Sequence, residues 1–547
     1  MSARSALAVA ALLALRAPAS AVNITVLAAP AKAGKASPAF WPQGLNVSLA
    51  TLGYYKGFSG DRRRASGVIN EGLTQDDLSI RFQRKTMRGV EFRQEFSGRY
   101  TNDRSLSPNK DFILQNLFAS VEKADRFAAR FGNILTNFSR YTMGTSLHGI
   151  NGYYQSGRLR ASGVVARGEE EDGVKFRRWT AGGRLEALNA PVKKLGLNAV
   201  SAGLSLVTVN DEEGSISNKT NLQKLDASVF GMDARLQFKR DVTLALDMAG
   251  SNQRDNKGPG NQGSAASADL DWKPGRFSAG LGFERQDPRF RSPAGSASPD
   301  VRRWTPRAAY QLAPWAQMDL AGEFSQNNLF RQLAYTTFGE TYRTGLSVRP
   351  LGWRKTGAWR NLGLSLGLRV NRQYASDASS KRRTANYDLA ANHPLGRFNY
   401  GLGLSLQSDK DLVSPANDRF LQTPKFSLGY QWSVVPRWNF SLNPTLSWSH
   451  TRDAKVATGQ VSRTLATELG LGGTVDGARF NLGFGTTSSQ RPGTGASYQR
   501  RLRASFGQTL RPGLSLTADF AHTYATESDR TRDYDENQWS LGLKYDF

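Results

Sequence analysis

The sequence of 547 residues contains no cysteine and only four histidines. Without cysteine the protein cannot form disulfides, thiolate zinc sites or the CxxCH attachment of haem. The histidines are not spaced as metal ligands, and the sequence has neither an HExxH motif nor a P-loop. These absences favour a protein that is not an enzyme and that binds no cofactor or metal of its own.

Long hydrophobic runs are also scarce. The run from Ala6 to Leu15 is too short to cross a bilayer as a helix, which takes about 20 residues. Arg4 precedes this run, and Ala19-Ser20-Ala21 follows it as a small-x-small cleavage site. We therefore expect residues 1–21 to be a secretory signal peptide. Residues 22–44 are rich in Ala, Pro and Lys, and we expect them to form a short periplasmic tail.

The remaining residues, 45–547, alternate between apolar and polar side chains. Leucine or valine occupies every even position from 362 to 370, while glycine, serine, arginine and asparagine occupy the odd positions from 363 to 371. Such alternation predicts strands with one apolar and one polar face. Because a bilayer core satisfies no backbone hydrogen bonds, strands of this kind cross it only as a closed sheet. The sequence thus predicts an all-β fold, a single large antiparallel transmembrane β-barrel.

Short turns alternate with longer polar loops along the chain. Lys273-Pro274-Gly275 and Arg511-Pro512-Gly513 are examples of the turns, and Ser251 to Ala266 and Gln286 to Arg303 are examples of the loops. Outer-membrane barrels have short turns on the periplasmic side and long loops outside the cell, whereas a soluble sandwich has no reason to alternate strictly. The pattern predicts about 26 strands with both chain ends on the short-turn side.

The last strand of this pattern ends on an aromatic residue. Its apolar positions are Trp539, Leu541, Leu543, Tyr545 and Phe547, and polar residues fill the positions between them. A soluble sandwich could alternate in the same way. The segment nevertheless resembles the closing strand of Gram-negative outer-membrane β-barrels, in which a terminal Phe is part of the insertion signal. The resemblance implies integral insertion in the outer membrane by the barrel-assembly machinery, with both termini in the periplasm.

The polar faces of the strands should line the barrel lumen. Their basic candidates are Arg81, Lys85, Arg93, Arg130, Arg160, Arg184, Arg235, Arg307, Arg343, Arg369, Arg501 and Arg503. Arginine rings attract anions, which predicts an anion-favouring pore. Alternatively, these residues pair with acidic side chains across strands and brace the wall. The net charge of +26 suggests contact with outer-membrane lipid and the phosphates of lipopolysaccharide, since export argues against nucleic acid.

The expected strand number bears on function because barrels near 22 strands already need a plug. Our leading hypothesis is a porin-like channel for passive passage of small polar or anionic solutes, narrowed by its own loops. The alternative is a sheath that encloses a lumen-filling partner, such as a multihaem cytochrome or an exported polymer. Its architecture would be similar to the sheath barrels of porin–cytochrome complexes, although no motif of that family is present.

Overall fold

The computed structural model describes residues 44–546 except 61–70, 104–110, 169–174, 193–195, 217–223, 239–240, 256–260, 355, 455–460, 492–494 and 528–532. The expected signal peptide, nearly all of the expected tail, and Phe547 lie outside the described residues. Three short 3-10 turns interrupt the strands: η2 (Glu213–Ser215), η3 (Ala358–Asn361) and η4 (Pro415–Asn417). Within the described ranges no helix is long and apolar enough to cross a membrane.

The described residues form 26 strands that belong to one antiparallel sheet. The strands range from 10 residues in β7 to 17 residues in β20. Their bounds are β1 Leu45–Gly60, β2 Glu71–Lys85, β3 Val90–Thr101, β4 Phe112–Lys123, β5 Phe127–Asn137, β6 Gly144–Ser156, β7 Leu159–Gly168, β8 Arg177–Val192, β9 Leu197–Glu212, β10 Leu225–Gln237, β11 Val242–Asp255, β12 Asn261–Trp272, β13 Phe277–Gln286, β14 Val301–Ala313, β15 Ala316–Gln326, β16 Thr337–Val348, β17 Gly363–Ala375, β18 Lys381–Leu395, β19 Phe398–Asp411, β20 Arg419–Val435, β21 Trp438–Asp453, β22 Val461–Val475, β23 Ala478–Arg491, β24 Gly495–Arg511, β25 Leu514–Glu527 and β26 Tyr534–Asp546.

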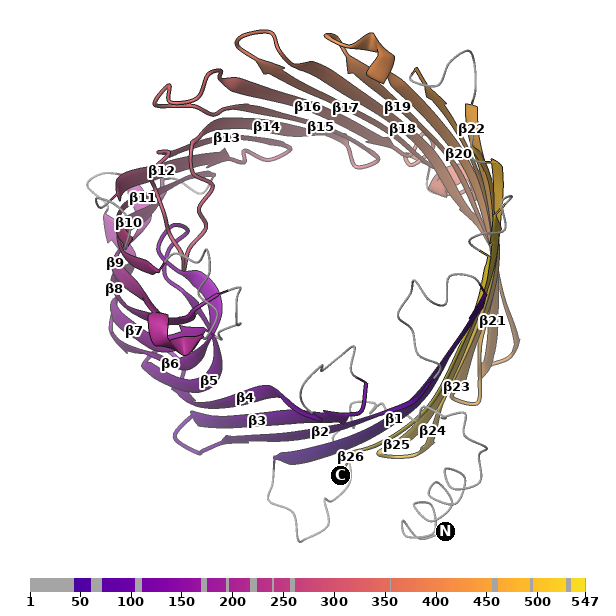
Figure 1. Ribbon diagram of the computed structural model, residues 1–547, viewed down its shortest axis with the longest axis horizontal. Helices are drawn as coiled ribbons and strands as arrows, with labels where there is room; N and C mark the ends of the chain where they lie inside the picture. Colours follow the sequence, from indigo (N-terminus) through magenta and orange to yellow (C-terminus); the bar gives the residue numbers. More distant parts are fainter. Residues whose placement is uncertain are drawn as a thin grey trace.

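Each strand pairs with the next along the chain, and the last strand pairs with the first. The closing register of β1 and β26 runs from Ser48 opposite Asp546 to Gly60 opposite Tyr534. The sheet is therefore a closed ring (Figure 1). Twenty-six strands about 4.8 Å apart and tilted by about 40° enclose a lumen about 50 Å across between opposite backbones. The prediction of an antiparallel barrel of about 26 strands is confirmed.

The two faces of the sheet differ as the alternation requires. On β9 and β10, Leu204, Leu206 and Phe230 share the outward face, and each is about half exposed to the surroundings. Their neighbours Val207 and Val229 point inward and are buried. A β-sheet is stable in a bilayer only if its lipid-facing side chains are apolar and its backbone hydrogen bonds form a closed ring without free edges. The outer face thus replaces the buried core of a soluble protein as the main apolar surface.

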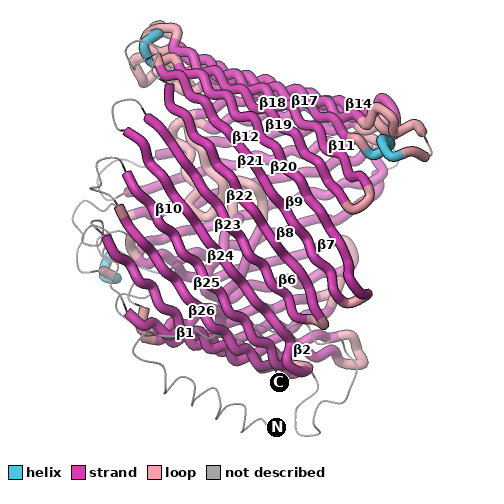
Figure 2. The backbone as a smooth tube through the Cα atoms, turned by 90° about the vertical axis from the view of Figure 1, so that its right-hand side faces the viewer, coloured by secondary structure: helices cyan, strands magenta, loops and turns pink. Residues whose placement is uncertain are grey.

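The connections also differ between the two ends of the barrel (Figure 2). At one end consecutive strands are joined by two to four residues, except between β16 and β17; β1 begins and β26 ends there. Connections at the other end are mostly longer but shorter than the sequence predicts. The predicted loop from Ser251 to Ala266 is wrong in extent, because β11 continues to Asp255 and β12 begins at Asn261. Strands that extend beyond the lipid need no apolar face, so their polar sequence has the same pattern as a loop.

Candidate functional site: the barrel interior

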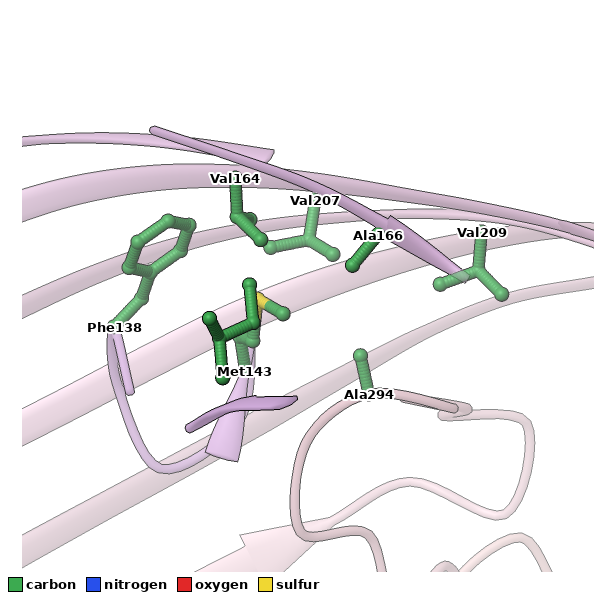
Figure 3. Packing of buried hydrophobic residues seen from close by; sticks show 8 residues of the cluster. Phe138, Met143, Val164, Ala166, Val207, Val209 and Ala294 are labelled. Carbon is green, nitrogen blue, oxygen red and sulfur yellow. The ribbon is translucent and has the colours of Figure 1, made fainter. Parts of the chain in front are cut away.

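Two segments at the long-connection end fold into the barrel. Residues 138–143 join β5 to β6, and residues 287–300 join β13 to β14; both lie inside the ring in Figure 1. Phe138, Met143 and Ala294 pack on Val164, Val207 and other inward side chains (Figure 3). A valine on a lumen wall would otherwise face water, and complete burial of such a side chain contributes about 1.5–3 kcal/mol. The apolar inner patch therefore holds the two segments against the wall.

Polar contacts fix the same two segments. The Arg140 guanidinium lies 2.8 Å from the Glu284 carboxylate of β13, and its backbone N–H donates to Asp247 of β11 at 3.0 Å. The Tyr141 hydroxyl donates to Glu284 at 3.3 Å, and Phe290 packs edge-on against the Tyr141 ring at 5.9 Å. Burial raises the pKa of Tyr141 to about 12, because the phenolate would lose its hydration.

The segments approach the wall very closely. The backbone of Phe290 passes directly over Gly263 of β12, where an added Cβ would lie 2.2 Å from the Phe290 nitrogen. The segments also bind each other, since the Gly144 N–H donates to the Ala294 carbonyl at 2.8 Å and the Ser296 N–H donates to the Arg140 carbonyl at 3.0 Å. They form one layer on the wall and do not span the lumen (Figure 1).

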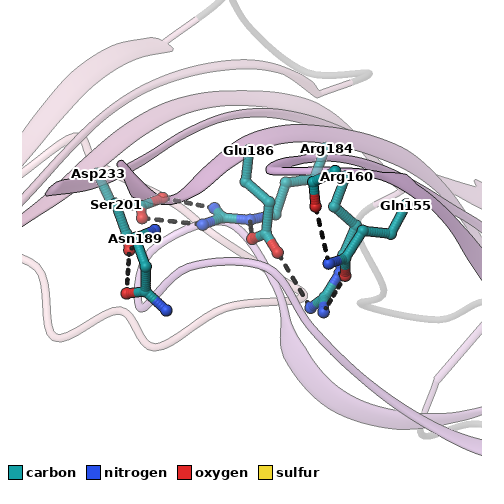
Figure 4. Close-up of polar contacts among 8 residues, drawn as sticks. Gln155, Arg160, Arg184, Glu186, Asn189, Ser201 and Asp233 are labelled. Atoms are coloured by element: carbon teal, nitrogen blue, oxygen red, sulfur yellow. Dashed lines mark hydrogen bonds and ion pairs between the residues drawn. The ribbon is translucent and has the colours of Figure 1, made fainter. Parts of the chain in front are cut away.

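Ion pairs connect the inward faces of β2 to β15, which we call the braced wall. Arg184 is its most enclosed arginine: the guanidinium contacts Glu186 at 2.7 Å and Asp233 at 2.9 Å, and the side chain is only 10% exposed (Figure 4). Arg160 contacts the same Glu186 at 3.1 Å. Further pairs of the braced wall are Arg81–Glu95, Arg93–Glu95, Arg99–Asp77, Arg130–Glu122, Arg178–Asp211, Arg303–Glu323 and Arg307–Asp271.

The inward faces of β16 to β25, which we call the open wall, are different. Arg343 of β16 stands directly opposite Arg369 of β17, and neither makes an ion pair. The register places Arg501 and Arg503 of β24 beside two glycines of β23, Gly485 and Gly483. Within the described part of the open wall no ion pair joins two inward side chains. The cations there are therefore available to whatever occupies the lumen.

Small polar residues make up most of the open wall. Glycine, serine, threonine and asparagine alternate inward along β19 to β23, and no aromatic side chain points inward among the described residues of β16 to β25. Towards the β26 seam, the small side chains leave a shallow hollow of about 440 Å³. Arg503, Asn481, Asp519 and Ser540 contribute polar groups to it. The result is a smooth, hydrated surface with widely spaced charges of both signs, since Asp388, Asp409 and Glu468 also point inward.

The register places all twelve basic candidates from the sequence on inward faces. Six of them lie in ion pairs of the braced wall: Arg81, Arg93, Arg130, Arg160, Arg184 and Arg307. Six make no ion pair: Lys85, Arg235, Arg343, Arg369, Arg501 and Arg503. Lys85 of β2 and Arg235 of β10 lie in the braced wall and the other four lie in the open wall, so paired inward arginines are confined to the braced wall but unpaired cations occur in both. Sequence reasoning missed Arg140, Tyr141 and Phe290, although three large apolar residues within the short segment 138–143 were a usable signal.

The four described residues of the expected insertion signal lie on the outward face of β26. They are Trp539, Leu541, Leu543 and Tyr545. The Trp539 ring packs against Phe520 of β25 with ring centres 4.1 Å apart, and it remains about half exposed. These residues belong to the apolar outer surface at the seam of the barrel.

Two features of the described residues resemble parts of catalytic sites. No group of His, Asp and Glu there could hold a metal ion. The stretch from Gly363 to Gly367 has the GxSxG spacing of hydrolase nucleophiles, but Ser365 lies within β17 and not at a strand-to-helix turn. His522 contacts Asn537 at 2.9 Å and Asp535 at 3.3 Å on the outward face of the sheet. Ser365 points inward from within the strand, whereas His522 points outward.

The closed antiparallel ring, the apolar outer face and the charged lumen define the fold of a large outer-membrane β-barrel. No protein-family model and no curated protein matches the sequence. Three similar solved structures are the P pilus usher PapC translocation pore, the Escherichia coli outer-membrane protein Wzi, and a variant porin of Rhodopseudomonas blastica.

The PapC structure aligns over 92% of this chain and 99% of its own, with 14% identity and a TM-score of 0.37. Wzi, described as a carbohydrate-binding β-barrel of capsule assembly, aligns over 61% and 82%, with 10% identity and a TM-score of 0.32. The porin aligns over 55% and 97%, with 12% identity and a TM-score of 0.27. Similarities this weak leave the function to be argued from the residues of this chain.

Proposed function

We propose that this protein is an integral outer-membrane conduit for a large, hydrated and anionic passenger, such as an exported polymer. The observation that carries the proposal is the open wall, where the inward arginines of β16, β17 and β24 make no ion pair. Unpaired lumen cations lower the energy of an anion inside the barrel, whereas paired cations do not. The short-turn end would face the periplasm, as in other barrels of this class.

The width of the ring supports a large passenger. The lumen is about 50 Å across between backbones, far wider than a lumen that side chains alone can fill. The two described inward segments cover one side only (Figure 1). A pore of this width breaches the outer membrane unless something narrows or occupies it, and in this proposal the passenger occupies it.

The chemistry of the open wall favours a hydrated polymer over a permanently bound protein. Stable protein interfaces use aromatic and large apolar anchors in their centre. The described inward positions of β16 to β25 provide mainly hydroxyl, amide, glycine and charged surface instead, and β21 with Asn439, Ser441 and Asn443 is an example of the uncharged part. Such a surface keeps its water and allows a passenger to slide.

A loop-narrowed porin for small polar or anionic solutes is the second candidate. The observation in its favour is the pair of inward segments, 138–143 and 287–300, which are fixed by both apolar and charged contacts. In this function the segments would reduce the cross-section and the open wall would select anions. The two candidates differ in the size of solute that they admit.

Dextran sulfate and neutral dextran of equal size distinguish the proposed function experimentally. The purified barrel is inserted in a planar bilayer, and each polymer is added while the current is recorded. We expect dextran sulfate to enter and block the current at much lower concentrations than neutral dextran, with salt weakening the block. Equal block by both polymers, or block by neither, would refute an anionic polymer as the passenger.

A further inference from the structure

The connection between β16 and β17 differs from all others at its end of the barrel. It comprises residues 349–362, whereas the other connections at this end span two to four residues. The sequence of this connection contains three arginines, one lysine and two tryptophans, and it contains no acidic residue. This connection is hereafter the β16–β17 arm.

The arm is held against the outer rim of the barrel. The Trp359 ring stacks on the His393 ring of β18, with ring centres 4.6 Å apart and planes 17° from parallel. The same His393 has its Nε2 3.0 Å from the Ala358 carbonyl oxygen, and it is only 5% exposed. His393 shares the outward face of β18 with Leu389 and Tyr387. The arm therefore lies on the lipid side of the rim.

Although these contacts hold the arm in place, both of its tryptophan side chains are largely exposed. Trp353 is 60% exposed and Trp359 is 59% exposed. The Arg354 guanidinium lies over the Trp353 ring, 5.2 Å from its centre. An arginine that stacks on an aromatic ring keeps its N–H donors directed outward, in a geometry that suits phosphate.

The arm continues a row of outward aromatic rings at the same end of the barrel. The ring centre of Phe398, which follows the β18–β19 turn, lies 4.6 Å from the ring centre of Tyr430. From Tyr430 the row extends through Trp432 and Phe440 to Phe480. Rows of aromatic side chains mark the boundary between lipid chains and headgroups. Exposed tryptophans and arginines beside this row consequently meet the headgroup layer.

We propose that the β16–β17 arm is a binding site for anionic phospholipid headgroups. Trp353 and Trp359 insert at the interface, and Arg354 and Arg360 bind the phosphates. Charge complementarity selects this occupant, because the arm carries only positive charges and adjoins the lipid-facing surface. The site is independent of what passes through the lumen, so the proposed function could fail without affecting it.

Phosphatidylglycerol and phosphatidylcholine are the probes for this site. The full barrel in detergent is titrated with either lipid at low salt, and retained lipid is counted by native mass spectrometry. We expect preferential retention of phosphatidylglycerol, and R354Q/R360Q should weaken it by about fivefold for each arginine removed. The matched control R331Q/R452Q makes the same charge change at the other end and should retain phosphatidylglycerol as the unaltered barrel does. Resistance of each variant to SDS at room temperature verifies that it is folded.

Brominated lipids provide a second measurement that needs no charge variant. In vesicles that contain brominated phosphatidylglycerol, the part of the tryptophan emission that disappears in W353F/W359F should be strongly quenched. Unchanged retention of phosphatidylglycerol by R354Q/R360Q, equal loss in R331Q/R452Q, or no quenching of Trp353 and Trp359 would each overturn the proposal. Capture of a protein by the arm in place of lipid would overturn it as well.

Discussion

The braced wall and the open wall contain similar strands but treat their inward charges in opposite ways. In the braced wall, Arg184 is enclosed between Glu186 and Asp233, and two inward segments cover the neighbouring apolar patch. In the open wall, Arg343 faces Arg369 without an acid in contact. The same residue type thus stabilises the ring on one side and remains available to the lumen on the other. Whether an inward arginine braces the wall or faces the lumen therefore depends on whether an acidic side chain lies within ion-pair distance.

The largest expected effect is the loss of attachment of the inward segments to the braced wall when the buried ring of Phe290 is removed. We expect Phe290→Ala to destabilise the attachment of residues 287–300 by about 3–5 kcal/mol, because it empties a completely buried aromatic site. Limited proteolysis of the reconstituted barrel would detect the released segment. Gly263→Ala should release it too, whereas Leu412→Ala at an exposed position should not. A protease-resistant Phe290→Ala barrel would show that the segment is held by other contacts.

The next largest effect is expected when one arginine is removed from each wall, because the two variants should differ in the free energy of unfolding. Arg184→Ala leaves the Asp233 carboxylate without its partner and leaves Glu186 with Arg160 alone, and we expect a loss of about 3 kcal/mol in the free energy of unfolding. Arg369→Ala in the open wall should change it by less than about 0.5 kcal/mol. Denaturant unfolding in lipid vesicles measures both. An equal loss of unfolding free energy in the two variants would show that inward arginines contribute equally to stability in both walls.

The pH dependence of the inward segments should be carried by Tyr141. Burial raises its pKa to about 12 from the ordinary value of about 10, so the folded state retains the proton more strongly than the released state. The attachment is therefore constant between about pH 7 and pH 10 and weakens by up to about 2.7 kcal/mol between pH 10 and pH 12. Proteolysis of residues 138–143 across this range measures the effect, and Tyr141→Phe should remove this contribution. Release that begins below pH 9 would point to another group.

The smallest expected effect concerns ion preference. R501Q/R503Q removes two unpaired charges from the open wall, and the chloride preference measured from reversal potentials in a potassium chloride gradient should fall. R500Q is the control, since Arg500 alternates to the outward face and donates to the Tyr498 hydroxyl. If R500Q lowered chloride preference as much as R501Q/R503Q, the open wall would not be the source of selectivity.

Local alternation was sufficient to predict the ring. A strand must turn every second side chain to lipid, so the repeated pattern revealed the strands, their approximate number and the inward face of Arg184 and Arg501 alike. The pattern could not assign partners, because the contact between Arg184 and Asp233 joins residues 49 positions apart and depends on register across strands. The pattern also could not reveal that Phe290 folds back onto Gly263, because residues in a loop show no regular alternation of apolar and polar side chains.

Polymer exclusion tests the central claim most directly, namely that the interior is a wide lumen with one covered and one open wall. Neutral polyethylene glycols of increasing size are added to both sides of a planar bilayer that contains the purified barrel. We expect polymers up to about 30 Å in diameter to enter and lower the conductance, given the strand number and one layer of inward segments. Exclusion of all but the smallest polymers would contradict the wide conduit and identify a loop-narrowed porin instead.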